Sequence, residues 1–318
     1  MGFTIQRSFG VAALAATTLV LAACGSSAAE DTATADSGSG DTQTLVFASI
    51  PSEESQSLQQ EYQLIAEVIE KETGNKVEFQ NATDYAAVIE AQRAGKVQIA
   101  AYGPFSYVTA KDTGVETTPI ASLVDAPDET PGYQSYAIVK SGSPIRSLAD
   151  YRGKTICFVD PGSTSGYLYP SAGLEEAGID PATDVTPVFA GGHDASVLAV
   201  MSGQCDAGFA YDSMVDQTMV SKGQIKPGDL DVLWKSETIA GSPVAISDSL
   251  SPELREQITS IFQTILNRPA LVEKGYCTDE ASCKLPENTD FGYVAVDDAS
   301  FDGVRKVCEI TQAEACKS

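Results

Sequence analysis

The stretch that decides the fold is Asp160-Pro161-Gly162-Ser163-Thr164-Ser165-Gly166-Tyr167. A strand-like apolar run, 155–159, precedes it, and a helix-like run, 171–177, follows it. Backbone N–H groups at a helix start have no intrahelical partner, and the helix dipole adds partial positive charge there. The stretch therefore predicts an anion site, to which the hydroxyls of Ser163, Thr164 and Ser165 can donate. The alternative is a Ser/Gly turn that only caps the helix.

The first residues carry a targeting signal rather than part of the fold. Arg7 gives a positive start, residues 9–23 are apolar, and Leu21-Ala22-Ala23-Cys24 ends the run. This ending resembles the lipobox of bacterial lipoproteins, which implies cleavage before Cys24 and a lipid on its sulfur; the alternative is an ordinary signal peptide. We expect a signal peptide at 1–23 and a lipidated, flexible tether at 24–43, because small polar residues cannot form a core.

Composition excludes several classes of function. The net charge is -24, which argues against nucleic-acid binding, and a bound anion must then be held by local dipoles and hydrogen bonds. Of seven cysteines, six remain when Cys24 is lipidated, and export favours disulfides. With His193 as the only histidine and no Cys-x-x-Cys, we expect no metal site and no cofactor. No second apolar run is long enough to span a membrane.

Strand-like and helix-like segments alternate along the chain, restart near residue 148, and give way to an irregular segment at 275–318. The expected strands are 45–50, 76–79, 97–102, 120–124, 135–140, 155–159, 186–189, 206–210, 231–234 and 244–246. The expected helices cover 62–69, 85–94, 171–177, 195–201 and 251–266, with others beginning at 103–104 and 211–212. This alternation predicts an α/β protein with mainly parallel sheets, whose ligand lies at the carboxyl ends of the strands.

An ordered set of short motifs between Leu45 and Leu266 resembles the phosphonate/phosphite-type substrate-binding proteins of ABC transporters. The motifs are Phe47-Ala48-Ser49-Ile50-Pro51-Ser52-Glu53, Asp84-Tyr85-Ala86-Ala87-Val88-Ile89-Glu90, Ala101-Tyr102-Gly103-Pro104, Pro131-Gly132-Tyr133, the stretch 160–167, Ala190-Gly191-Gly192-His193-Asp194, and Pro243. The resemblance implies a two-lobed periplasmic-binding-protein-like fold of type II, with the ligand in the cleft between the lobes. One lobe would comprise 44–135 plus 240–318, and the other 136–239.

The resemblance also implies which residues contact the ligand. The hydroxyl turn of the family carries over to Ser163, Thr164 and Ser165, its two tyrosines to Tyr85 and Tyr133, and its histidine to His193. For the tyrosines and the histidine, the alternative is a purely structural role. Acidic residues that hold a ligand ammonium in some members carry over to Ser213, beside Asp212, and to Ser242.

A missing carboxylate at Ser242 predicts a preference for phosphite, phosphate or a small alkylphosphonate over 2-aminoethylphosphonate, because a buried ammonium needs a paired charge. The alternative is that Asp212 turns toward the ligand and supplies that charge.

Three functions remain open at this stage. The leading one is a non-enzymatic, monomeric receptor, lipid-anchored outside the bacterial cell membrane, that delivers a small phosphorus oxyanion to an ABC permease. The second is a binding protein for another oxyanion, such as sulfate or molybdate. The third is a serine hydrolase, in which Ser163 or Ser165 would act with His193. Against it, Gly162-Ser163-Thr164-Ser165-Gly166 places Thr at the centre of a Gly-x-Ser-x-Gly pattern, and no motif supplies an acid.

Three disulfides are expected from proximity alone. Cys157 and Cys205 lie on two strands of the same proposed lobe, and Cys277–Cys283 and Cys308–Cys316 are local pairs. Six cysteines allow many other connectivities, among which the sequence does not choose.

Overall fold

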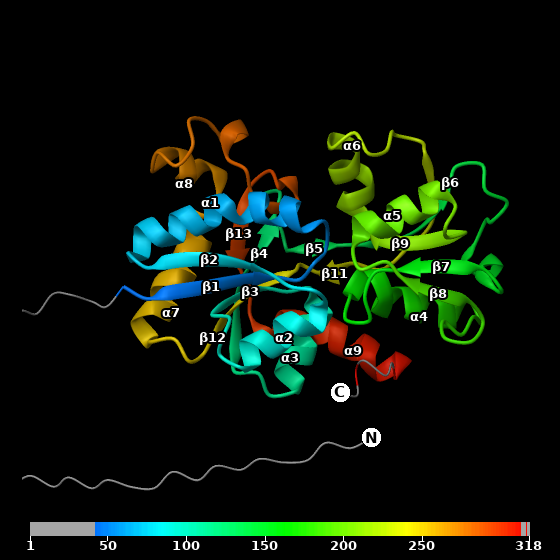
Figure 1. The fold of residues 1–318 in the computed structure, drawn as a ribbon, viewed down its shortest axis with the longest axis horizontal. Helices are drawn as coiled ribbons and strands as arrows, with labels where there is room; N and C mark the ends of the chain where they lie inside the picture. The colour runs from blue at the N-terminus through cyan, green and yellow to red at the C-terminus, as the bar shows by residue number, and fades with distance from the viewer. Residues whose placement is uncertain (1–41, 313–315, 317–318) are drawn as a thin grey trace, which may run out of the picture. The chain divides into compact units, whose positions relative to one another are not determined.

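Two β-sheets and a short two-stranded ladder organise residues 42–312 and 316, the part of the chain that the computed structural model describes (Figure 1). These residues belong to one compact unit, Thr42–Ser318. The expected signal peptide, the expected lipidation site at Cys24 and most of the expected tether lie outside the described residues.

The first sheet has six strands within the described residues, in the order β13-β4-β12-β3-β1-β2. They are β1 (Thr44–Ser49), β2 (Lys76–Asn81), β3 (Ile99–Ala101), β4 (Thr117–Val124), β12 (Pro243–Ser247) and β13 (Gly292–Ala295). Strands β2, β1 and β3 run parallel, whereas β12 is antiparallel to both β3 and β4, and β13 is antiparallel to β4.

The second sheet repeats this arrangement with five strands in the described chain, in the order β10-β6-β9-β7-β8. They are β6 (Ser135–Lys140), β7 (Thr155–Phe158), β8 (Thr186–Phe189), β9 (Ala207–Tyr211) and β10 (Leu230–Lys235). Strands β8, β7 and β9 are parallel, and β6 is antiparallel to β9 and β10. In each sheet, therefore, one antiparallel strand is inserted beside a parallel group.

The inserted strands follow the two places where the chain passes between the sheets. β5 (Gly132–Tyr133) leads into β6, β11 (Ile239–Ala240) leads into β12, and β5 and β11 pair with each other in an antiparallel ladder. The expectation of mainly parallel sheets is wrong, since both sheets are mixed. The reason is that the strand after each crossing, β6 or β12, runs in the opposite direction to the parallel strands of the sheet that it joins.

Helices cover both faces of both sheets (Figure 1). On the first sheet, α1 (Ser55–Thr73), α7 (Pro252–Ser260), η4 (Ile261–Ile265) and α8 (Arg268–Glu273) bury one core, and α2 (Tyr85–Arg93), α3 (Pro104–Asp112) and α9 (Asp302–Thr311) bury the other. On the second sheet, α5 (His193–Ser202), η3 (Met214–Thr218) and α6 (Met219–Ser221) lie on one face, and η1 (Leu148–Tyr151) and α4 (Tyr169–Glu176) on the other. The alternation of side chains along strands explains this, because Leu45 and Phe47 enter one core and Ala48 enters the other.

Helix starts follow their capping residues. The Asp84 carboxylate accepts the Ala87 N–H at 2.7 Å and begins α2, and the Ser251 hydroxyl accepts the Leu254 N–H at 3.3 Å and begins α7. Gly74, with a φ of 71°, ends α1, because glycine adopts the left-handed conformation of a helix C-terminus without strain.

Two expectations about helices need correction, and a third is confirmed. The helix expected at 171–177 is part of a longer helical segment, in which η2 (Thr164–Leu168) leads directly into α4. The helix expected to open at 211–212 is confirmed, because the chain is helical from Asp212, directly after the last residue of β9, and continues into η3. The segment 275–318 is not irregular throughout, because it supplies β13 and α9, whose buried Val304 and Val307 have helical spacing.

The structure contains three disulfides among the described residues: Cys157–Cys205, Cys277–Cys283 and Cys308–Cys316. Cys157 lies on β7, and Cys205 lies in the segment leading into the adjacent parallel strand β9. This bridge therefore ties the centre of the second sheet, whereas the other two close short local loops.

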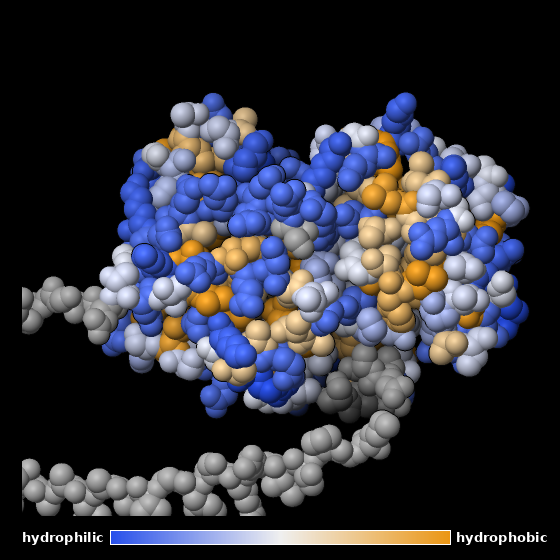
Figure 2. All heavy atoms as spheres, viewed as in Figure 1, coloured by the Kyte–Doolittle hydropathy of each residue, from blue (hydrophilic) through white to orange (hydrophobic). Residues whose placement is uncertain are grey.

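Hydrophilic side chains cover the exposed face of α1 and much of the surrounding surface (Figure 2). No helix within the described residues is long and apolar enough to cross a membrane. In the same part of the chain, no three His, Cys, Asp or Glu side chains are grouped so that they could hold a metal ion.

Candidate functional site

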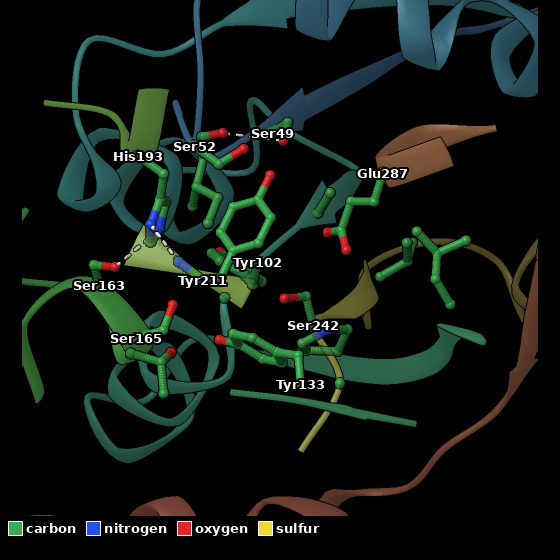
Figure 3. A pocket seen from close by; sticks show the side chains of 18 of the residues that line it. Ser49, Ser52, Tyr102, Tyr133, Ser163, Ser165, His193, Tyr211, Ser242 and Glu287 are labelled. Carbon is green, nitrogen blue, oxygen red and sulfur yellow. Dashed lines mark hydrogen bonds between the residues drawn. The ribbon is translucent and has the colours of Figure 1, made fainter. Parts of the chain in front are cut away.

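A cavity of about 90 Å³ lies where loops and helix starts from both sheets meet (Figure 3). Seven of the eight ligand-contacting residues expected from the sequence line it: Tyr85, Tyr133, Ser163, Thr164, Ser165, His193 and Ser242. Asp212 lines a neighbouring hollow instead.

The hydroxyl turn owes its shape to the start of η2. Ser163 is the N-cap residue, and its Oγ accepts the Gly166 N–H at 3.0 Å. Gly166 is required here, because a Cβ at this position would lie 2.4 Å from the Val159 side chain. The anion-site and capping interpretations of this turn are thus compatible, since the capped helix start also faces the cavity.

Thr164 connects the turn to the other sheet. Its Oγ1 accepts the Phe105 N–H at 2.9 Å, at the start of α3. This contact brings the positive ends of two helical segments to the same cavity. The hydroxyl hydrogen of Thr164 is not used in that contact and remains a potential donor.

Tyr85 begins α2 and is 1% exposed. Its hydroxyl is buried and has no hydrogen-bond partner among the described residues. Burial raises the pKa of Tyr85 well above its ordinary value, and nearby Ser163 offsets only part of this effect. A buried hydroxyl without a partner is unusual in a folded protein, and here it lines the cavity.

The hydrogen bonds of His193 assign its tautomer. Its Nδ1 accepts the Tyr211 N–H at 3.2 Å, so the ring proton must reside on Nε2. Nε2 lies 3.4 Å from the Ser163 Oγ and therefore donates toward it (Figure 3). Burial lowers the pKa of His193 to about 3, so the ring is a neutral N–H donor at neutral pH.

Tyr133 and Ser242 come from the two crossings between the sheets. Tyr133 pairs with Ile239 in the β5–β11 ladder, and its ring meets that of Tyr211 edge-on at 6.4 Å. Burial raises the pKa of Tyr133 well above its ordinary value, so the phenol stays protonated. Ser242 immediately precedes β12 and lies on the same side of the cavity as Tyr133 (Figure 3).

The carboxylate of Asp212 accepts hydrogen bonds from the backbone. Its two oxygens accept the N–H groups of Gln134, at 3.0 Å, and Ser213, at 2.9 Å. Burial raises the pKa of Asp212, and these hydrogen bonds offset part of the effect. Turning this side chain toward the cavity would leave both backbone donors unpaired.

Glu287 is a charged cavity residue that the sequence motifs do not single out. It belongs to η6 (Pro286–Asn288), inside the segment expected to be irregular, and its carboxyl group points into the cavity toward Ser242 (Figure 3). Glu287 has a φ of 60° and Asn288 a φ of 55°. A Pro-Glu-Asn sequence is typical of a turn, but it does not reveal which distant residues the turn will face.

A carboxylate therefore does reach the cavity, although neither Ser213 nor Ser242 supplies one. Burial, followed by the charges of Glu53, Asp212 and Asp125, raises the pKa of Glu287 to about 7. Glu287 is an exposed residue that lines both the cavity and the neighbouring hollow. The reason given for disfavouring an amine-bearing ligand does not hold for this cavity, and the preference itself stays a prediction.

Beside the cavity, polar contacts join the two sheets and their helices. Lys222, which follows α6, contacts Glu53 and the Ser57 Oγ, and lies 3.6 Å from Glu61. The backbone N–H of His193 donates a hydrogen bond to the Ser52 carbonyl at 2.8 Å. Burial and the neighbouring Glu53 raise the pKa of Glu61 to about 8.

The geometry at His193 is opposite to that of a serine hydrolase. In such enzymes the histidine Nδ1–H donates to a carboxylate, and the bare Nε2 takes the serine proton. Here Nδ1 accepts a backbone N–H, so Nε2 already carries a proton and cannot accept another from Ser163. His193 therefore offers a hydrogen bond here and does not act as a general base for Ser163.

Apart from the Glu287 carboxyl group, the polar groups of the cavity are neutral donors. Hydroxyls, the imidazole N–H and helix starts converge on it, and among the described residues neither Lys nor Arg lines it. Such a set can hold the oxygens of a small anion.

Comparison with known proteins places the chain in a family. A family model described as ABC transporter, phosphonate, periplasmic substrate-binding protein, matches residues 47–278. The Phosphate-import protein PhnD of Mycolicibacterium smegmatis is 44% identical over 313 residues, with 96% of each chain covered. The Phosphonates-binding periplasmic protein of Escherichia coli is 32% identical over 249 residues, covering 76% of this chain and 73% of that protein.

Solved structures agree in fold. A binding protein component of an ABC phosphonate transporter from Pseudomonas aeruginosa has a TM-score of 0.73 at 27% identity, covering 86% of this chain and 87% of that one. PhnD1 from Prochlorococcus marinus, in complex with methylphosphonate, has a TM-score of 0.72 at 18% identity, covering 85% and 98%. These matches identify the two-sheet architecture as that of a periplasmic binding protein, and the family match and the relative at 44% identity show that this chain belongs to the phosphonate periplasmic substrate-binding proteins of ABC transporters.

Proposed function

We propose that this protein is an extracytoplasmic receptor that captures a small phosphorus oxyanion and delivers it to an ABC permease. Inorganic phosphate is the leading ligand, and phosphite and small alkylphosphonates are the others. The observation that carries the proposal is a cavity whose donors are neutral hydroxyls and an imidazole N–H, in a family of transport binding proteins. The relative at 44% identity, a Phosphate-import protein, supports phosphate as the first choice.

The ligand would be enclosed between two lobes, 44–135 plus 240–318 and 136–239. The strands of the two sheets support this division, because each strand falls within one proposed lobe apart from Ser135, the first residue of β6. Contacts from Ser163, Thr164 and Ser165 on one side and Tyr85 on the other would then bring the lobes together on the anion.

The site proposal assigns binding and no turnover. Ser163, Thr164, Ser165, His193, Tyr85, Tyr133 and Ser242 would contact the ligand. Because His193 carries its proton on Nε2, it would stabilise a bound oxygen rather than activate a serine. Sustained hydrolysis of an ester by the purified protein would contradict this assignment.

The anchor and the oligomeric state complete the proposal. A lipid on Cys24 would hold a monomeric receptor at the outer face of the cell membrane, next to its permease. Mass spectrometry of the mature N-terminus checks the lipid, and sedimentation checks the monomer. A mature chain without an acyl group at Cys24 would contradict the anchor only.

A thermal-shift screen tests the ligand, because a compound that binds only the folded state raises the unfolding temperature. Phosphate, phosphite and methylphosphonate should raise it more than sulfate or molybdate at equal concentration. Titration of methylphosphonate against 2-aminoethylphosphonate then decides whether an amine is accepted. A shift with sulfate or molybdate alone would assign the protein to another oxyanion.

A further inference from the structure

Glu287 places an acidic group in a cavity built for an anion. It is supplied by η6, a turn outside the matched residues 47–278, and packs between α1 of one sheet and η3 of the other. Its carboxyl group points at the space where Ser242 and the other donors converge (Figure 3). When it is ionised, the Glu287 carboxylate can only accept hydrogen bonds. A ligand oxygen that binds beside it must therefore carry a hydrogen.

The groups around Glu287 do not neutralise it. From the loop before α1 and from α1 itself it faces Glu53 and Glu61. The neighbouring hollow, which Glu287 also lines, holds four more acidic side chains: Asp125, Glu129, Asp212 and Asp216. Lys222, the cation beside Glu53 and Glu61, is engaged by these two side chains. A fully deprotonated anion beside Glu287 would therefore meet like charge and two lone pairs without a hydrogen between them.

Oxyanions differ in whether they bring that hydrogen. At neutral pH inorganic phosphate keeps at least one P–OH group in either of its common ionisation states. Sulfate keeps none. The proposed donors can satisfy the other oxygens of both anions equally, so the face toward Glu287 is where the two ligands differ.

We propose that Glu287 accepts the P–OH hydrogen of bound phosphate and thereby makes the site select an oxyanion that carries a proton. This inference rests on the proposed function and adds a specificity-determining residue to it. One proton lies between the carboxyl group and the ligand oxygen. Phosphate brings this proton, and sulfate requires Glu287 itself to be protonated.

The consequence is a difference in pH dependence. Above the pKa of Glu287, near 7, sulfate binding must take up a proton, so its affinity should fall by up to about tenfold per pH unit. Phosphate affinity should change much less over the same range. His193 stays neutral throughout, because its pKa is about 3. Glu61, with a pKa of about 8, titrates in the same range without lining the cavity, and it does so in both the wild type and a Glu287 variant, so comparing the two proteins separates its effect.

The test uses the full mature chain, with phosphate and sulfate as probes from about pH 6 to about pH 9, a range that brackets the titration. In the Glu287→Gln variant, sulfate affinity should lose its pH dependence. The preference for phosphate over sulfate at high pH should fall by at least about tenfold, because the amide can donate where the carboxylate could not. Glu129→Gln is the matched control: it makes the same charge change in the neighbouring hollow without lining the cavity. It should keep the wild-type selectivity.

A second variant and a second measurement keep the outcome decisive. Asn tolerates the positive φ of position 287, so Glu287→Asn replaces the Gln variant if that variant folds poorly. Calorimetry of the wild type in buffers of different ionisation enthalpy should find uptake of close to one proton with sulfate at high pH. Unchanged selectivity in both variants, or no proton uptake with sulfate, would overturn the role of Glu287. Failure of the wild type to bind phosphate at all would instead overturn the proposed function.

Discussion

His193 is held neutral by burial, and this has a consequence for stability. Its pKa falls from 6.5 to about 3 on folding, so between these values the unfolded chain binds a proton that the native protein does not. The stabilising effect is therefore complete above pH 6.5 and is lost as the pH falls toward 3. We expect the free energy of unfolding to decline over this range, with His193 contributing at most about 1.4 kcal/mol per pH unit.

Urea denaturation of the wild type and of His193→Gln at several pH values measures this contribution. The difference between the two proteins should grow with pH up to about 6.5 and then level off. A constant difference across the range would show that His193 is not the buried neutral group described above.

Tyr85→Phe should separate stability from binding. The hydroxyl is buried and unpartnered among the described residues, so its removal should leave the ligand-free protein equally or more stable. Binding should weaken by about 1.5–3 kcal/mol, the usual worth of a hydrogen bond to a charged group. Calorimetric titration and urea denaturation of the same variant give the two quantities.

Tyr107→Phe is the matched control for this change. The Tyr107 hydroxyl donates to Asp298 at 2.6 Å, away from the cavity. Its loss should lower stability and leave ligand affinity unchanged. If Tyr85→Phe behaved in the same way, Tyr85 would have only a packing role.

At the scale of elements, the cluster between the end of α6 and the start of α1 is expected to hold the two lobes together around the ligand. Lys222→Met removes the cation that Glu53 and Glu61 share, and with it the contact between the end of α6 and the segment at the start of α1. Ligand affinity should fall roughly two- to tenfold, since the pair is only partly buried. The loss should shrink at high salt.

Lys274→Met is the control for Lys222→Met, because Lys274 pairs with Glu72 at 3.5 Å and both lie within one proposed lobe. Affinity is measured by calorimetry at low and high ionic strength. Equal effects of the two substitutions would indicate a general charge effect rather than a contact that closes the cleft.

At the scale of the whole molecule, the Cys157–Cys205 bridge spans a sequence separation of 48 and ties two neighbouring strands of the second sheet. Replacing both cysteines with Ala should lower the free energy of unfolding by about 2–4 kcal/mol, with ligand affinity retained in the folded protein. Urea denaturation measures the loss. Peptide mapping without reduction checks the pairing, and free thiols at Cys157 and Cys205 would contradict it.

The strand order is also a property of the whole molecule. Both sheets place their second, first and third strands side by side and then insert a strand that has crossed from the other lobe. The crossings at β5 and β11 lie beside the cavity, so the residues that link the lobes, Tyr133 and Ser242, are also cavity residues. Because the segments that connect the two sheets also line the cavity, a ligand bound there would contact those connections and so favour one arrangement of the sheets.

The sequence by itself determined the local elements and most of the candidate site. Caps such as Asp84 and Ser251, the stop at Gly74 and the turn from Ser163 to Gly166 depend on neighbouring residues, so they can be read from consecutive positions. The ordered motifs also identified seven of the residues that line the cavity. These residues follow strands or begin helices, and the ends of those strands and helices meet at the cavity.

Only the tertiary structure decided which strands cross, what Asp212 contacts and where Glu287 points. The antiparallel β6 and β12 are chosen by partners far away in the chain, and the Asp212 oxygens are used by backbone groups that the sequence pattern does not locate. Glu287 lies on a turn without periodic apolar residues, so nothing local predicts its direction. The physical reason is the same in each case: local hydrogen bonds and periodicity act between neighbours, whereas the orientation of a strand or a turn is set by packing between distant segments.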